Sequence, residues 1–229
     1  MHNLFEYCNG SPIFSVDYLG TDAIILQSKE SVFKFGHMGL LLQYDKSWYY
    51  WYWGMDGIIA GLQYAITALR GLGAACIAAT AGSVAIVLAM LTFTITRTLT
   101  KNVRAKSTLK KICAKNKITH TATLSNINAK LDNADVGYSE YFEKGLFLRG
   151  DFSKSYKYLK KQKALHTYNL IYNNCMQTSI SALYRGKFNS NNTKNRLRLV
   201  LARNFIVPNF AYDYLKKYYT SLMESERRN

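Results

Sequence analysis

The sequence of 229 residues predicts an α+β fold in which a small antiparallel sheet is followed by a cysteine-bearing helix. Two apolar and aromatic runs, 36–43 and 48–53, flank a short polar turn and predict a β-hairpin. Far downstream, apolar side chains recur at helical spacing behind Cys175, at Met176, Ile180, Leu183 and Tyr184. An uncharged run between these regions predicts an inserted hydrophobic helix or helical hairpin.

The first half of the chain is predicted to contain the sheet and the insertion. Residues 21–27 and 32–43 have strand character, and the aromatic run 48–53 completes a small antiparallel sheet. Residues 57–96 then form one or two apolar helices, and 97–118 form a basic helix or linker. The segment 57–118 is therefore predicted to be a helical insertion in the domain.

The second half is predicted to be mainly helical. Residues 119–144 are polar and loop-rich, and Lys144 begins a short strand. The predicted helices cover 152–165, 174–186 with Gly186 at the end, 196–206, and 210–225 with Asn209 as the cap.

The run 71–96 contains 26 residues without a charge and is long enough to cross a bilayer as a helix. Eight lysines and arginines follow between Arg97 and Lys117, with no acidic residue before Asp132. Cations beside an apolar span favour the side of a membrane that carries anionic lipid. We therefore predict a transmembrane helix at 71–96. The alternative is a buried Ala- and Gly-rich helix followed by a solvated basic helix.

The composition is strongly basic, with 30 Lys and Arg against 14 Asp and Glu and a formal charge of +16. This balance predicts a polyanionic neighbour such as an anionic membrane, an acidic partner or nucleic acid. The pattern argues against nucleic acid as the target, because no acidic or histidine cluster of a metal-dependent nuclease is present. The cysteines Cys8, Cys76, Cys113 and Cys175 show no metal-ligand spacing, so no metal or cofactor is expected. The first residues lack the pattern of a signal peptide.

Cys175 is the candidate nucleophile. Asn173 or Asn174 is a suitable N-cap, which places the thiol in the first turn of its helix. The unpaired N–H groups and the helix dipole there favour thiolate over thiol. The small side chains of Ser179 and Ala182 share a face with Cys175 and allow another element to approach closely.

His37 is the candidate base. It precedes an apolar strand run and shares a strand face with Gly39, Leu41 and Gln43. A Cys–His pair is the minimum for thiol catalysis, because the imidazole accepts the thiol proton and returns it to the leaving group. The plainer interpretation makes Cys175 a small buried apolar residue and His37 a structural side chain.

The segments Gly-His-Met-Gly-Leu-Leu at 36–41 and Tyr-Asn-Leu-Ile-Tyr-Asn-Asn-Cys at 168–175 resemble the circularly permuted papain-like class. That class includes NlpC-type peptidases in permuted order and relatives of lecithin retinol acyltransferase. The resemblance implies a permuted papain-like fold with Cys175 as nucleophile and His37 as base. It places a third, polar member on the following strand, where Tyr52 is the polar side chain near that position.

Residues 4–20 resemble the end of an RHS repeat core, through Gly-Ser-Pro at 10–12 and Asp-Tyr-Leu-Gly at 17–20. The segments 145–156 and 207–210 resemble parts of toxin tips of this type. The resemblance implies that 1–20 is a remnant of the core and that 21–229 is a permuted papain-like toxin domain. It also implies secretion or delivery to a target cell and an immunity protein as a possible partner, whereas association with a membrane is expected from the apolar run 71–96.

Together these features predict a bacterial toxin tip that is a thiol hydrolase or acyltransferase and acts on an amide or ester near a membrane. Its substrate would be a protein, peptidoglycan or membrane lipid. Two alternatives stay open. One is a membrane-inserting toxin module with an inactive papain-like domain, and the other is a basic toxin that acts on nucleic acid.

Overall fold

The computed structural model describes residues 21–29, 36–55, 103–134, 136, 142–162, 167–169 and 173–222. The predicted RHS remnant at 1–20 and the predicted apolar helices at 57–96, including the span 71–96, lie outside these residues. Within the part that is described, no helix is long and apolar enough to cross a membrane.

The centre of the fold is an antiparallel sheet of seven strands, which confirms the predicted α+β class with an antiparallel sheet. The strands lie in the order β7-β4-β3-β2-β1-β5-β9. Their bounds are β1 Ala23–Ser28, β2 His37–Tyr44, β3 Ser47–Met55, β4 Val103–Ala114, β5 Lys144–Leu148, β7 Thr167–Tyr168 and β9 Thr220–Ser221. A separate small pair joins β6 (Gly150–Asp151) to β8 (Lys187–Phe188).

The predicted hairpin between β2 and β3 is confirmed. Tyr44 pairs with Ser47, so the connection has two residues, Asp45 and Lys46. Both have positive φ, 44° and 57°, as a type I′ turn requires. This turn fixes the register in which the aromatic strand lies against β2.

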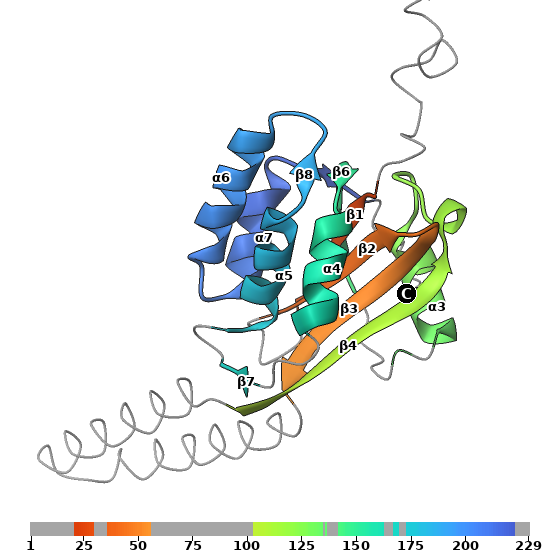
Figure 1. Ribbon diagram of the computed structural model, residues 1–229, viewed down its shortest axis with the longest axis horizontal. Coiled ribbons are helices and arrows are strands. Elements are labelled where there is room, and N and C mark those ends of the chain that lie inside the picture. Colours follow the sequence, from red (N-terminus) through yellow and green to blue (C-terminus); the bar gives the residue numbers. More distant parts are fainter. Residues whose placement is uncertain are drawn as a thin grey trace, which may run out of the picture.

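The helices divide between the two faces of the sheet (Figure 1). Four of them, α4 to α7, lie together on one face, and α3 lies on the other. Their bounds are α3 Leu124–Asn133, α4 Ser153–Gln162, α5 Cys175–Tyr184, α6 Asn192–Arg203 and α7 Pro208–Lys216, with a 3-10 turn, η1, at Lys115–Lys117. The Cys-bearing helix α5 packs on β2 and β3, between α4 and α6.

The central strands are buried on both faces, which explains their continuous apolar sequences. In β2, Met38 and Leu40 contribute to the core beneath α4 to α7. Leu41 contributes to a second core on the α3 side of the sheet. A strand that is solvated on one face would instead alternate apolar and polar side chains.

Several predictions about elements were wrong. The predicted last helix, 210–225, ends at Lys216 as α7, and Thr220–Ser221 form β9 instead. The basic segment within 97–118 is not a helix from 103 onward, because 103–114 form β4, which pairs along most of β3. Among the described residues, β4 has a second neighbouring strand only at Val103 and Arg104, and lysines suit a strand that is largely unpaired on one side. The segment 119–144 is not simply a loop, because α3 occupies part of it, with the Thr123 side chain accepting a hydrogen bond from the Asn126 N–H.

Candidate active site

The start of α5 is built by side-chain capping. Asn174 accepts a hydrogen bond from the Gln177 N–H at 2.9 Å, and the Gln177 side chain accepts one from the Asn174 N–H at 3.2 Å. This capping box fixes the first turn of the helix. Asn174 is therefore the N-cap, one of the two residues predicted for that role, and Cys175 is the first helical residue.

The turn before α5 is held to the sheet. Asn169 and Asn173 exchange two backbone hydrogen bonds, at 3.2 and 3.1 Å. The Trp53 indole N–H donates to the Asn173 carbonyl at 3.3 Å, which ties this turn to the end of β3. These contacts place Tyr168 and Cys175, on either side of the turn, at the same end of the sheet.

His37 lies at the first position of β2, at that end. The preceding residue, Gly36, has φ of 86°, a conformation that favours glycine. A side chain at this position would also collide with Asn209 of α7. Position 36 therefore favours glycine, and its backbone conformation sets the position of His37.

The structure brings Cys175 and His37 together. The Cys175 side chain is hydrogen-bonded to the His37 side chain, to the backbone of Met38 and to the Tyr168 hydroxyl. Cys175 and His37 are both buried, with 1 % and 2 % of their surfaces exposed. The two residues predicted as nucleophile and base are thus direct neighbours in a dry environment.

Opposite effects act on the Cys175 thiol. Burial by itself raises its pKa, because it disfavours the charged form. The charge and hydrogen bond of His37, and the hydrogen bonds from Met38 and Tyr168, act more strongly in total and lower it. The net pKa is below the ordinary thiol value, so the surroundings of this cysteine favour the thiolate.

Tyr52, the predicted third member, contacts His37 with its ring. The ring centroids are 5.0 Å apart and the planes are inclined by 33°. Tyr52 is 5 % exposed, so its ring covers the imidazole from a buried position. Such a contact can fix the orientation of the imidazole by packing.

Tyr168 is the neighbour of the thiol that sequence reasoning did not assign. Its hydroxyl accepts a hydrogen bond from the Cys175 N–H at 3.4 Å and also contacts the sulfur. Burial, followed by the nearby Cys175 charge, raises the pKa of Tyr168 well above its ordinary value, so the hydroxyl keeps its proton. Tyr168 belongs to the motif at 168–175, and it meets Cys175 because Asn169 and Asn173 pair through their backbones.

The described residues contain no group of three or more His, Cys, Asp or Glu side chains arranged to hold a metal. Cys113 lies on β4, and burial raises the pKa of its thiol. The site thus consists of Cys175, His37, Tyr168 and Tyr52 around one end of the sheet. No protein-family model, curated protein or solved structure matches the chain in sequence or fold comparisons.

Proposed function

We propose that this protein is a thiol hydrolase or acyltransferase that transfers an acyl group from an amide or ester through Cys175. The observation that carries the proposal is the set of polar contacts on the Cys175 sulfur, from His37, the Met38 backbone and Tyr168. A cysteine that serves only as a small apolar core residue needs no such partners. A basic side chain beside a thiol with a lowered pKa is the arrangement that nucleophilic catalysis requires.

The proposed reaction uses these positions. The imidazole of His37 takes the proton of the Cys175 thiol, and the thiolate attacks the carbonyl carbon of the substrate. The carbonyl oxygen takes the place of the Tyr168 hydroxyl as the acceptor of the Cys175 N–H, which then stabilises the negative charge that develops on this oxygen. The C–N or C–O bond then breaks, and the leaving amine or alcohol receives the proton from His37. Water or another acceptor releases the acyl group from the sulfur.

Tyr168 has a defined part in this proposal. Its hydroxyl lies against both the sulfur and the Cys175 N–H, the two groups that a substrate carbonyl must approach. Because it stays protonated, it can donate a hydrogen bond to the thiolate in the free enzyme and to the oxyanion during attack. Tyr52 positions the His37 ring.

The order of the elements supports a permuted papain-like fold. The strand with His37 comes before the helix with Cys175, and that helix packs on an antiparallel sheet. With the resemblances at 4–20 and 145–156, this supports the proposal that the domain is the tip of an RHS-type toxin.

The position of the apolar run supports a substrate in or near a membrane. β3 ends at Met55 and β4 begins at Val103, which pairs with Tyr168 of β7. Both points from which the intervening segment leaves the sheet therefore lie at the end that carries the site. A membrane-bound segment attached there would hold Cys175 near lipid esters or lipid-linked peptides.

A second candidate function is a membrane-inserting toxin module with an inactive papain-like domain. Two observations favour it: the thiol is 1 % exposed, and 71–96 carry no charge. The two functions differ in whether toxicity needs the sulfur of Cys175.

The test is to express the whole chain in bacteria as wild type, Cys175→Ala and His37→Ala, with Cys113→Ala as a matched control. Growth, lipid composition and peptidoglycan composition are measured together. Loss of toxicity and of new lipid or peptide products in the first two variants alone is the expected result. Unchanged toxicity in Cys175→Ala would favour the membrane-inserting module.

A further inference from the structure

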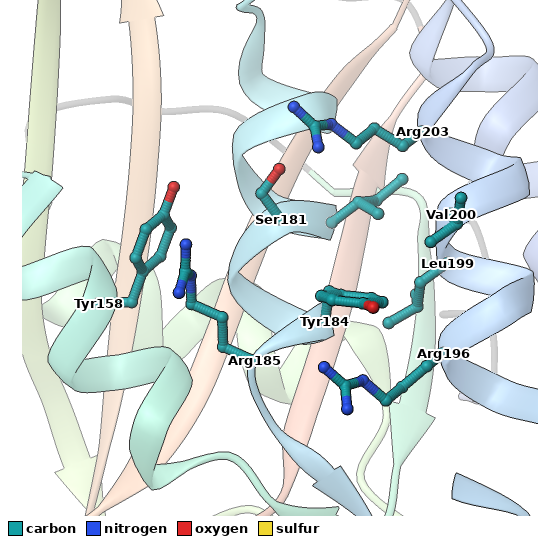
Figure 2. Close-up of a pocket in the computed structure, with 9 residues that line it drawn as sticks. Tyr158, Ser181, Tyr184, Arg185, Arg196, Leu199, Val200 and Arg203 are labelled. Carbon is teal, nitrogen blue, oxygen red and sulfur yellow. The ribbon is translucent and has the colours of Figure 1, made fainter. Parts of the chain in front are cut away.

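A groove of about 510 Å³ lies between α4, α5 and α6 (Figure 2), and Cys175 is not among the residues that line it. Its walls come from Tyr158 of α4 and from Arg196, Leu199, Val200 and Arg203 of α6, with Ile180, Ser181, Tyr184 and Arg185 of the α5 region between them. Three arginines line it, and no Asp or Glu side chain among the described residues does so. The groove therefore presents concentrated positive charge that the described part of the chain does not neutralise there.

Two of these arginines are held by aromatic rings. The guanidinium of Arg185 lies 4.3 Å from the centre of the Tyr158 ring, and that of Arg196 lies 4.1 Å from the centre of the Tyr184 ring. A guanidinium stacked in this way keeps the N–H groups along its edge available for a ligand. The Arg196 Nε is buried and has no hydrogen-bond partner within the described structure.

The helix next to the groove exposes apolar side chains. On α6, Arg196, Val200 and Arg203 are four and three residues apart and share the face that lines the groove. Leu197 and Leu201 follow on the adjoining face and are 59 % and 46 % exposed, and Val200 is 43 % exposed. Arginine and tyrosine beside exposed aliphatic side chains have the composition of a protein-binding surface.

We propose that this groove binds an acidic segment of a partner protein in which carboxylates alternate with apolar side chains. The carboxylates would accept hydrogen bonds from Arg185, Arg196 and Arg203, and the apolar side chains would cover the exposed aliphatic groups of α6. Charge complementarity with a chain of +16 also favours an acidic partner. This site does not depend on the chemistry of Cys175.

Other polyanions fit the groove less well. A nucleic-acid backbone offers phosphates to the arginines but no apolar groups to cover Leu197, Val200 and Leu201. A bilayer surface offers both, but it is flat and fluid, whereas these guanidiniums line a recessed groove and two are fixed by rings. A shaped ligand can use all of these features at once.

The test uses the full-length protein and short fluorescein-labelled peptides in which Asp alternates with Leu. Matched peptides replace every Asp by Asn, or every Leu by Ser, and fluorescence anisotropy is measured at an ionic strength of about 0.15 M. The Asp and Leu peptide is expected to bind at least about ten-fold more tightly than either matched peptide, because charged hydrogen bonds and apolar burial both contribute. Equal binding of the Asn version would overturn the proposal, as would no binding of any peptide.

Substitutions inside and outside the groove test whether the peptide binds there. Arg196→Gln and Arg185→Gln should each lower the affinity for the Asp and Leu peptide by about ten-fold, because each variant loses a charged hydrogen bond. Arg196→Lys should also weaken it, because the charge remains but the planar guanidinium is lost. Arg149→Gln removes the same charge from an exposed position outside the groove and should change binding by less than about two-fold.

Two outcomes would show that the groove binds another kind of partner or that it is not a defined binding site. A single-stranded oligonucleotide or an anionic vesicle that binds more tightly than the peptide and loses binding in Arg196→Gln would replace the protein partner. An equal loss in Arg149→Gln and Arg196→Gln would show attraction by net charge alone. Circular dichroism of each variant separates a loss of binding from a loss of folding.

Discussion

Cys113 and Cys175, the two cysteines among the described residues, have different surroundings. Burial raises the pKa of both thiols, but at Cys175 the contacts with His37, Met38 and Tyr168 reverse that effect. At Cys113 the charges of Lys130 and Lys117 act in the same direction without overcoming burial, and the pKa stays raised. A hydrogen-bonding neighbour in contact with a buried thiol therefore lowers its pKa more than partly solvated lysines do.

The first prediction concerns the pH dependence of alkylation. Only the thiolate reacts, so a lowered pKa places the inflection of the rate for Cys175 below 9.0, the ordinary thiol value. The inflection for Cys113 should lie above 9.0. His37→Ala should move the Cys175 inflection upward and leave that of Cys113 in place. Iodoacetamide labelling across a pH series, read peptide by peptide by mass spectrometry, measures both thiols in one sample.

The second prediction concerns Tyr168. Tyr168→Phe removes the hydroxyl that contacts the Cys175 sulfur and should raise the pKa of that thiol by about one pH unit, since a hydrogen bond to a charged group contributes about 1.5 kcal/mol. The alkylation profile of Cys175 again measures the change. If the hydroxyl also stabilises the oxyanion, turnover should fall further at a pH where both proteins are fully in the thiolate form.

Tyr219→Phe is the matched control for this change. It removes another buried hydroxyl, one without a hydrogen-bond partner in the described structure. Its removal should leave the profile of Cys175 unchanged and the stability equal or slightly higher. Identical profiles for the wild type and Tyr168→Phe would show that the hydroxyl does not act on the thiol.

At the scale of elements, the N-terminus of α5 determines where the thiol stands. Its cap, Asn174, also donates a hydrogen bond from its amide to the Ile206 carbonyl at 3.2 Å, which links α5 to the connection between α6 and α7. One side chain therefore both starts the helix and holds it against the next layer. A change here affects stability and the position of the thiol together.

The third prediction separates these two roles of Asn174. Asn174→Ala loses both, and should lower the free energy of unfolding by about 2 kcal/mol, with about 1 from the cap and about 1 from the amide hydrogen bond. Asn174→Ser keeps a capping oxygen without adding a charge and loses the amide donor to Ile206, so it should lose about half as much. Urea unfolding followed by circular dichroism measures the difference. Equal losses for Ala and Ser would show that the cap does not stabilise α5.

The elements that the sequence predicted are those with short-range signals. The hairpin had a polar two-residue turn between apolar runs, and α5 had Asn174 before an apolar stripe. The helix α3 also carried such a signal, since Thr123 precedes Leu124, Ile127 and Leu131, all buried, but the many polar residues around them concealed it.

The features that the sequence did not predict depend on long-range contacts. Lysines conceal the strand alternation of β4, and only its pairing with the aromatic β3 makes it a strand. Asn209 was expected to cap a helix beginning at 210, but α7 begins two residues earlier, at Pro208, and the Asn209 side chain accepts a hydrogen bond from Gln27 instead. Tyr168 meets the sulfur through the backbone pairing of Asn169 with Asn173.

At the scale of the whole molecule, the described elements separate the thiol from the arginine groove. Cys175 begins α5, whereas Arg185 directly follows it, and the helix between them spans about 15 Å. The segment between β3 and β4 leaves the sheet at the thiol end. The proposed partner and the proposed membrane contact therefore need not compete for one surface.

The fourth prediction tests the membrane contact. Because 71–96 carry no charge, the full chain expressed in bacteria should remain with the membrane fraction after a high-salt wash. Attachment through the basic residues alone would instead be lost at high salt, where surface charges are screened. Immunoblots of the washed membrane and supernatant fractions measure the distribution.

Two double variants keep the length of the segment, one with changed polarity and one that stays apolar as the matched control. Val84→Asp together with Val87→Asp should move the chain to the supernatant, because each charge near the centre of a spanning helix costs about 3 kcal/mol. Val84→Leu with Val87→Leu should leave it in the membrane.

If all three chains stay in the supernatant, the run does not insert and the case for a membrane substrate loses its main support. If all three stay in the membrane, another part of the molecule holds them there, and the same fractionation of the Cys175→Ala and Arg196→Gln variants would show whether the thiol site or the groove contributes.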